Sequence, residues 1–203
     1  MSEFNLKTGD ILLCDYEGTN WFFYYFSKLI KFFTHSKYSH ISMILKDPVF
    51  IHPNLKGYYV WQSSWTGKLD PQDDEIKLGV QITPFDEVYK FYQSNNSHIS
   101  VRRINAPKNT FNNELLENIH EVVYKRPYDI IPSDWLHALI HKDTNPQKTD
   151  RFWCSSLVGY IYTRCHILSK DTDWSLLRPS DFSNQSTLDF INNCFLSKEE
   201  NIL

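Results

Sequence analysis

The chain has 203 residues, of which 41% are hydrophobic and 16% aromatic, enough for one domain with a hydrophobic core and too few for two of ordinary size. Its formal net charge of −3 provides no broad basic surface, which argues against nucleic acid as a partner. The four cysteines include no CxxC pair, a pattern typical of free thiols in a reducing compartment.

The first half of the chain contains short strands and two helices. Alternation of apolar and polar residues between turn residues indicates strands, and an apolar repeat near 3.6 residues indicates helices. Thr19 or Asn20 is the predicted N-cap of the first helix, and Thr83 with Pro84 begins the second. The pattern predicts a turn followed by a short strand at residues 8–13, strands at residues 39–45, 58–64 and 97–104, and helices at residues 19–33 and 83–92.

Beyond residue 108 the pattern is mainly helical. Helices are predicted at residues 110–124 and 133–141, and a third begins near Cys154. Residues 141–150 are polar and are the best candidate for a lid or an insertion. Because the strands come early and the helices late, we expect an α+β fold in a single domain of residues 1–203.

The aromatic helix, which runs from Trp21 to Phe33, carries more bulk than one core stripe needs. The simplest explanation is packing against the sheet. The alternative is a wall for an acyl chain, or a membrane-surface contact helped by Lys28 and Lys31. The run is too short to cross a bilayer, and the N-terminus lacks the features of a signal peptide, so we expect a cytoplasmic or intracellular protein.

Cys154 is predicted to lie on the inward face of the first turn of its helix. The simplest interpretation is a buried structural thiol, since free cysteine is among the most buried residue types. The alternative is a nucleophile, because the partial positive charge and unpaired N–H groups of a helix N-terminus stabilise a thiolate and an oxyanion. The inward stripe at helical spacing comprises Cys154, Leu157, Val158, Ile161, Tyr162 and Cys165, the last of which is predicted to be core.

His40 is the best candidate for the base that a catalytic thiol needs. It begins a predicted strand on the less apolar face, and the simplest alternative is a hydrogen-bonded histidine at a sheet edge. If residues 39–45 and 58–64 form a hairpin centred on Ile51, His40 lies directly opposite Gln62. Gln62 would then orient the imidazole, as the third member of a catalytic triad does. A slip of one residue would turn Gln62 to the other face.

Other polar residues have simple structural explanations. Tyr38 and Ser39 precede the histidine and are candidate oxyanion donors or turn residues. Asp10 and Asp129 are expected to order turns rather than to take part in catalysis. His35, His40 and His52 do not show the spacing of a zinc site, so neither a metal nor another cofactor is expected.

Several motifs in order along the chain resemble the circularly permuted branch of the NlpC-type papain-like superfamily. YiiX-like cysteine hydrolases and their poxvirus relatives are the most similar members, and the lecithin:retinol acyltransferase group is more distant. The matching pieces are Gly9-Asp10, the run from Ser36 to His40, Gln62 and the run from Trp153 to Ser156, with RPYD (126–129) and RPSD (178–181) also resembling family segments. The similarity spans nearly the whole chain.

The resemblance implies a papain-like fold with a small antiparallel sheet packed against the cysteine helix. It implies Cys154 as nucleophile, His40 as general base and then acid, and a polar third residue, for which Gln62 is the candidate. YiiX-like proteins commonly carry an acid at that position, and a neutral amide stabilises an imidazolium less than a carboxylate does.

The expected function is therefore hydrolysis of an amide or ester by a Cys-His pair through a thioester, with peptide, amide or acyl-lipid substrates. One alternative is acyl transfer or lipid hydrolysis by the same cysteine. Another is a binding or structural protein that kept the fold and lost turnover. We expect an intracellular protein, and the resemblance to poxvirus relatives also implies association with virions. The sequence predicts no oligomeric state.

Overall fold

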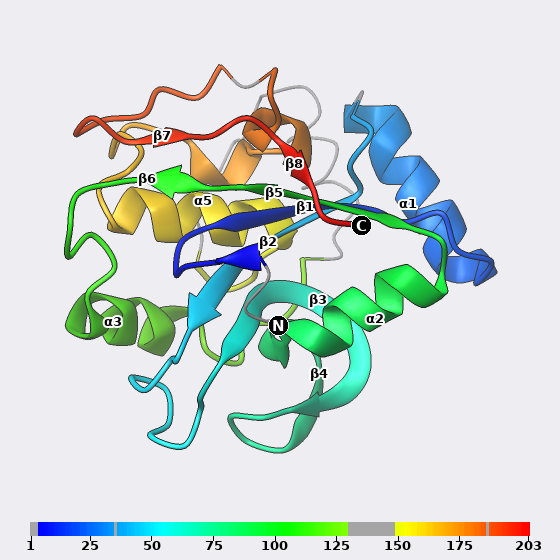
Figure 1. Cartoon of the computed structure of the whole chain (residues 1–203), viewed down its shortest axis with the longest axis horizontal. Helices are drawn as coiled ribbons and strands as arrows, with labels where there is room; N and C mark the ends of the chain where they lie inside the picture. Colours follow the sequence, from blue (N-terminus) through cyan, green and yellow to red (C-terminus); the bar gives the residue numbers. More distant parts are fainter. Residues whose placement is uncertain (1–3, 35, 130–148, 186) are drawn as a thin grey trace.

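A six-stranded antiparallel sheet forms the centre of the molecule (Figure 1). The computed structural model describes residues 4–34, 36–129, 149–185 and 187–203. The strand order is β4-β3-β2-β1-β5-β8, and a separate pair is formed by β6 and β7. The strands are β1 (Ile11–Asp15), β2 (His40–Lys46), β3 (Tyr58–Asp70), β4 (Glu75–Pro84), β5 (His98–Arg102), β6 (Ile104–Asn105), β7 (Phe195–Leu196) and β8 (Glu200–Asn201).

Helices cover both faces of this sheet, so the fold is α+β as predicted. The residues Ile41, Met43 and Leu45 of β2 share one hydrophobic cluster with α5, whereas Ile44 shares the other cluster with α2. Alternation along β2 therefore separates two layers of core. The helices are α1 (Trp21–Thr34), α2 (Phe85–Ser94), α3 (Asn113–Val123) and α5 (Cys154–Arg164), with 3₁₀ turns η2 (Trp174–Leu176) and η3 (Pro179–Phe182).

Helix α5 is buried around its whole circumference from Cys154 to Tyr162, and not only along the predicted stripe. The sheet covers one side, and the segment that carries Trp174 covers another. The Tyr162 hydroxyl donates to the Gly9 carbonyl over 2.6 Å, which ties the late helix to the turn before β1. A helix held on all sides presents its first residue in a defined position.

The structure differs from the predicted elements mainly at β4. That strand and the extension of β3 to Asp70 were not predicted, and the helix predicted from residue 83 begins at Phe85 instead. Residues 83 and 84 belong to β4, because Thr83 pairs with Val60 across the hairpin. The predicted helix at 133–141 lies outside the described residues, as does the predicted loop up to residue 148.

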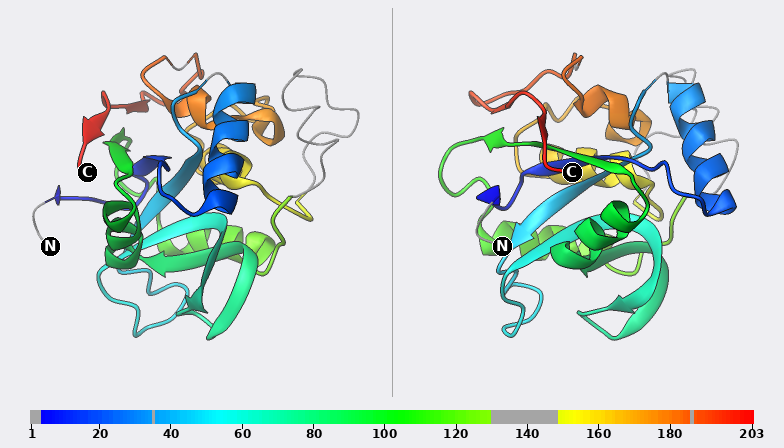
Figure 2. Two further views of the ribbon diagram at one scale, coloured as in Figure 1. Left: turned by 90° about the vertical axis from the view of Figure 1, so that its right-hand side faces the viewer. Right: turned by 45° about the vertical axis from the view of Figure 1, so that its right-hand side comes forward.

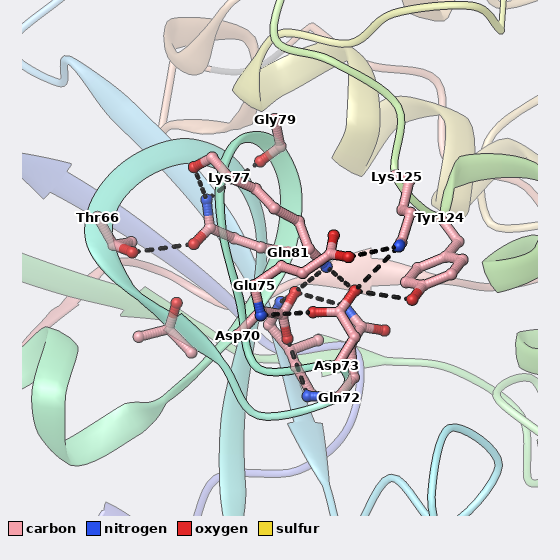
Figure 3. A network of polar contacts seen from close by, with 12 residues as sticks. Thr66, Asp70, Gln72, Asp73, Glu75, Lys77, Gly79, Gln81, Tyr124 and Lys125 are labelled. Carbon is pink, nitrogen blue, oxygen red and sulfur yellow. Dashed lines mark hydrogen bonds and ion pairs between the residues drawn. The ribbon is translucent and has the colours of Figure 1, made fainter.

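A polar network holds the tip of the β3–β4 hairpin against the end of α3 (Figure 3). Lys77 forms ion pairs with Asp70 at 2.8 Å and with Asp73 at 2.6 Å. Asp73 also accepts a hydrogen bond of 2.7 Å from the Tyr124 hydroxyl. Because Asp70 is fully buried, Lys77 offsets a charge that would otherwise be costly to bury. The network fixes the position from which the chain leaves α3.

The candidate active site

Cys154 is the first residue of α5, and no side chain caps the helix. The preceding residue, Trp153, has extended backbone, and its indole N–H donates to the Leu177 carbonyl over 3.2 Å. The Ser155 hydroxyl donates to the same carbonyl over 2.6 Å. These bonds secure the helix start, whose first N–H groups have no partner within the helix itself.

The Cys154 thiol is buried, with 4% of the residue exposed. Burial raises the pKa of the thiol, and hydrogen bonds from the backbone N–H groups of Ile41, Ser155 and Cys154 itself lower it. Because Ile41 directly follows His40, the sulfur lies against the beginning of β2. The structure thus brings the candidate nucleophile to the strand end that carries the candidate base.

His40 and Gln62 form the hydrogen bond expected of an oriented imidazole. The His40 Nε2 atom lies 2.8 Å from Gln62 Oε1, and Gln62 Nε2 donates to the Thr83 hydroxyl over 3.0 Å. An amide oxygen only accepts, so Nε2 carries the proton and Nδ1 of the neutral ring keeps a lone pair. Burial lowers the pKa of His40 to about 4, and the bond to Gln62 partly opposes that change.

The hairpin register predicted from the sequence is wrong by two residues. The observed pairs include Met43 with Trp61 and Ile44 with Val60, whereas the prediction opposed His40 and Gln62 directly. Continuing the observed register places Ser42 opposite Gln62, so His40 is its diagonal neighbour. A shift of two residues leaves each side chain on its face, and diagonal neighbours remain within reach of long side chains.

A cavity of about 310 Å³ opens beside His40, on the α2 side of the sheet. Its polar end includes Ser39, His40, Gln62 and Thr83. Its lining also contains apolar side chains, of which Trp65, Leu78 and Phe91 are 47%, 46% and 42% exposed. Cys154 is not among the residues that line this cavity. Large exposed apolar side chains around a cavity are typical of a binding site.

The remaining candidates from the sequence have structural partners. The Tyr38 hydroxyl donates to Glu199 over 2.6 Å, and Ser39 accepts from the Tyr16 N–H over 3.4 Å, although Ser39 also lines the cavity. The buried Asp10 accepts from the Lys7 and Ile104 N–H groups at 2.9 and 3.0 Å, so it orders a turn.

Further residues at the site were missed by the sequence analysis. Thr83 was predicted to be a helix cap and instead holds Gln62. Tyr92 of α2 lines the cavity, and Cys14 lies directly opposite His40 in the β1–β2 ladder. Tyr128 also lines the cavity, and the N–H of Asp129 donates to the Phe152 carbonyl over 3.2 Å. The contacts that bring β1 and α2 to the site join residues far apart in the sequence, so no local pattern predicts them. Of the missed residues, only Thr83 had a usable signal, which is the alternation of apolar residues in β4.

Helix α1 stands at the opposite side of the molecule from α3 (Figures 1 and 2). Its Trp21, Tyr25 and Phe32 are 72%, 66% and 72% exposed. They lie on one helical stripe, since their spacing is four and seven residues. Lys31 differs from the expectation of a surface-facing cation, because it pairs with Asp15 and its side chain is only 12% exposed.

Within the described ranges, which omit His35, no group of three or more His, Cys, Asp or Glu side chains has a metal-binding arrangement. None of the helices in those same ranges is both long and apolar enough to cross a membrane. All four cysteines are unpaired and buried, and burial raises the pKa of Cys14 to about 12.

Comparison of the chain with models of known protein families and with curated protein sequences finds no match. The arrangement itself therefore carries the functional argument. It combines a thiol at an uncapped helix start, an imidazole with an oriented tautomer, and a cavity that borders the imidazole.

Proposed function

We propose that the protein is a thiol hydrolase of the permuted papain-like kind, acting on an amide or ester. Cys154 is the nucleophile, His40 the general base and then acid, and Gln62 the residue that orients the imidazole. The observation that carries this proposal is the bond between His40 Nε2 and Gln62 Oε1, beside a strand whose next N–H points at the Cys154 sulfur.

The reaction proceeds in two halves. The Cys154 sulfur attacks the substrate carbonyl carbon as its proton passes to His40 Nδ1, and N–H groups at the helix start receive the oxyanion. The imidazolium then protonates the leaving amine or alcohol, which departs and leaves a thioester on Cys154. Water attacks the thioester as His40 takes its proton. The acid departs, and the proton returns from His40 to the sulfur.

The second candidate function is transfer or hydrolysis of a lipid acyl group by the same cysteine. The apolar lining beside His40 favours it, because Trp65, Leu78 and Phe91 would cover a hydrocarbon chain. In acyl transfer, the acyl group passes from Cys154 to an acceptor other than water, and in lipid hydrolysis it passes to water. The exposed aromatic stripe of α1 would bring the cavity to a lipid surface, which co-sedimentation with phospholipid vesicles tests.

Intact mass after incubation with activated acyl esters and peptide amides tests the proposal. We expect a thioester adduct on the wild type and on Cys165→Ala, and none on Cys154→Ala. Cys165 is the matched control, because it is a buried thiol at the other end of the same helix. A longer optimal acyl chain would favour the lipid function.

The absence of an adduct with every donor, together with slow alkylation of Cys154, would instead favour a binding protein with a retired site. We further propose that the enzyme works in a reducing, intracellular compartment, where its thiols stay free, and that it associates with virions.

A further inference from the structure

Tyr128 lies at the candidate site but has no role in the proposed chemistry of Cys154, His40 and Gln62. It lines the cavity together with His40 and Gln62. The structure gives its hydroxyl no hydrogen-bond partner within the described part of the chain. Tyr128 is only partly buried, so its hydroxyl can bond to water or to a ligand that occupies the cavity.

The backbone around Tyr128 is held on both sides. Its N–H donates to the Leu78 carbonyl of β4 over 3.1 Å, and the Phe152 N–H donates to the Pro127 carbonyl over 3.1 Å. The Ser63 hydroxyl donates to the Phe152 carbonyl over 2.6 Å, which fixes the segment that leads to Cys154. Tyr128 and Phe152 form a parallel bridge, so the tyrosine lies beside the strand-like approach to the nucleophile.

The electrostatics agree with this placement. Burial is the main cause that raises the pKa of Tyr128 well above its usual value. The negative charge of a Cys154 thiolate raises it further. The hydroxyl therefore keeps its proton throughout the neutral range and remains a donor. It is also close enough to the sulfur to respond to charge there.

We propose that the Tyr128 hydroxyl donates a hydrogen bond to the oxyanion that forms when Cys154 attacks a carbonyl. It would act together with the N–H groups at the start of α5, from the cavity side of the reacting carbon. This assignment rests on the proposed function and adds a catalytic residue to it. No proton is transferred from Tyr128, because a hydrogen bond alone stabilises the developing charge.

Two reactions of the same thiol test the assignment. Acylation of Cys154 by 4-nitrophenyl butyrate forms an oxyanion, whereas alkylation by iodoacetamide needs the thiolate and forms none. For Tyr128→Phe, which keeps the ring, we expect acylation to slow by roughly a hundredfold and alkylation to keep its wild-type rate. Tyr160→Phe is the matched control, since Tyr160 is a buried tyrosine that packs on Phe152 outside the cavity lining.

The other outcomes overturn the assignment in distinguishable ways. Equal slowing of acylation and alkylation would make Tyr128 a residue that positions or activates the thiol. Unchanged acylation would remove it from the reaction. A wild-type protein that is never acylated at Cys154 would refute the proposed function itself. Retained alkylation of Tyr128→Phe shows in the same samples that the site has kept its structure.

Discussion

Burial acts on Cys154 and His40 in opposite directions on the pKa scale, and both shifts favour the uncharged forms. Desolvation raises the pKa of the thiol and lowers that of the imidazole to about 4. The pair at rest is thus a thiol beside a neutral histidine rather than a thiolate–imidazolium ion pair. In the proposed mechanism, His40 then acts as a general base during the attack, and Gln62 contributes orientation without charge.

Gln62→Glu should convert this neutral pair toward an ion pair. A carboxylate at 2.8 Å from Nε2 would raise the pKa of His40 by about one or more, and the imidazolium would stabilise the thiolate. Thr83, which now accepts from Gln62, can rotate its hydroxyl to donate to the carboxylate. We expect iodoacetamide to modify Cys154 several-fold faster at neutral pH, measured by mass spectrometry against time.

Gln62→Leu is the companion variant, because it removes the hydrogen bond and adds no charge. We expect its Cys154 to be no more reactive than the wild-type thiol, and acylation to fall as the imidazole loses its orientation. If Gln62→Glu behaved like Gln62→Leu, His40 would not be coupled to the thiol.

At the scale of elements, the approach of residues 126–128 to β4 depends on Gly79. Its φ is +152°, and a Cβ there would lie 2.3 Å from the Arg126 carbonyl oxygen and 3.0 Å from the Tyr128 nitrogen. These are backbone atoms, so the segment would have to move away as a whole. The Val80 N–H bond to the Arg126 carbonyl, now 2.9 Å, would lengthen with it.

Gly79→Ala is therefore expected to lower the free energy of unfolding by more than about 1 kcal/mol, as for alanine at an incompatible backbone position. Urea denaturation measures the loss. Acylation of the folded fraction should also slow, because Tyr128 moves with the segment. Gly57→Ala is a useful comparison, since it has positive φ but open space around its Cβ position. Equal stability losses would mean that backbone strain alone, and not the approach of Tyr128, matters at Gly79.

The sequence predicts the elements that bear the site better than it predicts how they meet. Alternation in β2 and β3 correctly places His40 and Gln62 on one face, and the register error of two residues does not alter that. Strand β4 was missed although Ile76, Leu78, Val80 and Ile82 alternate, because Thr83 and Pro84 read as a helix start. The position of Tyr128 follows from the docking of two distant segments, which has no local signal.

For the whole molecule, two partly buried histidines make the free energy of unfolding depend on pH. Burial lowers the pKa of both His40 and His120 to about 4, and the charge of Lys77 adds to the effect at His120. The unfolded chain binds protons near pH 6.5, so between about 6.5 and 4 it holds more protons than the folded protein. Above pH 6.5 these two histidines do not lower the free energy of unfolding. As the pH drops through this window, their effect lowers it progressively.

We expect the free energy of unfolding from urea titrations at several pH values to show that decline. His120→Asn should reduce the slope of the free energy of unfolding against pH by up to about 1.4 kcal/mol per pH unit, which corresponds to one bound proton. His98→Asn is the control, because His98 is exposed. A slope that His120→Asn left unchanged would assign the acid sensitivity to carboxyl groups instead.

The burial of α5 around its circumference also has a consequence for the timing of synthesis. The strands β1 to β5 are complete by residue 102, but Cys154 emerges later, and the Tyr162 bond to Gly9 closes a loop of 153 residues. Contacts of such long range form late, and chains grow from the N-terminus at about 5–20 residues per second. A nascent chain therefore carries the histidine and its glutamine for several seconds without the thiol, so the proposed enzyme becomes competent only after Cys154 and Tyr162 have been synthesised.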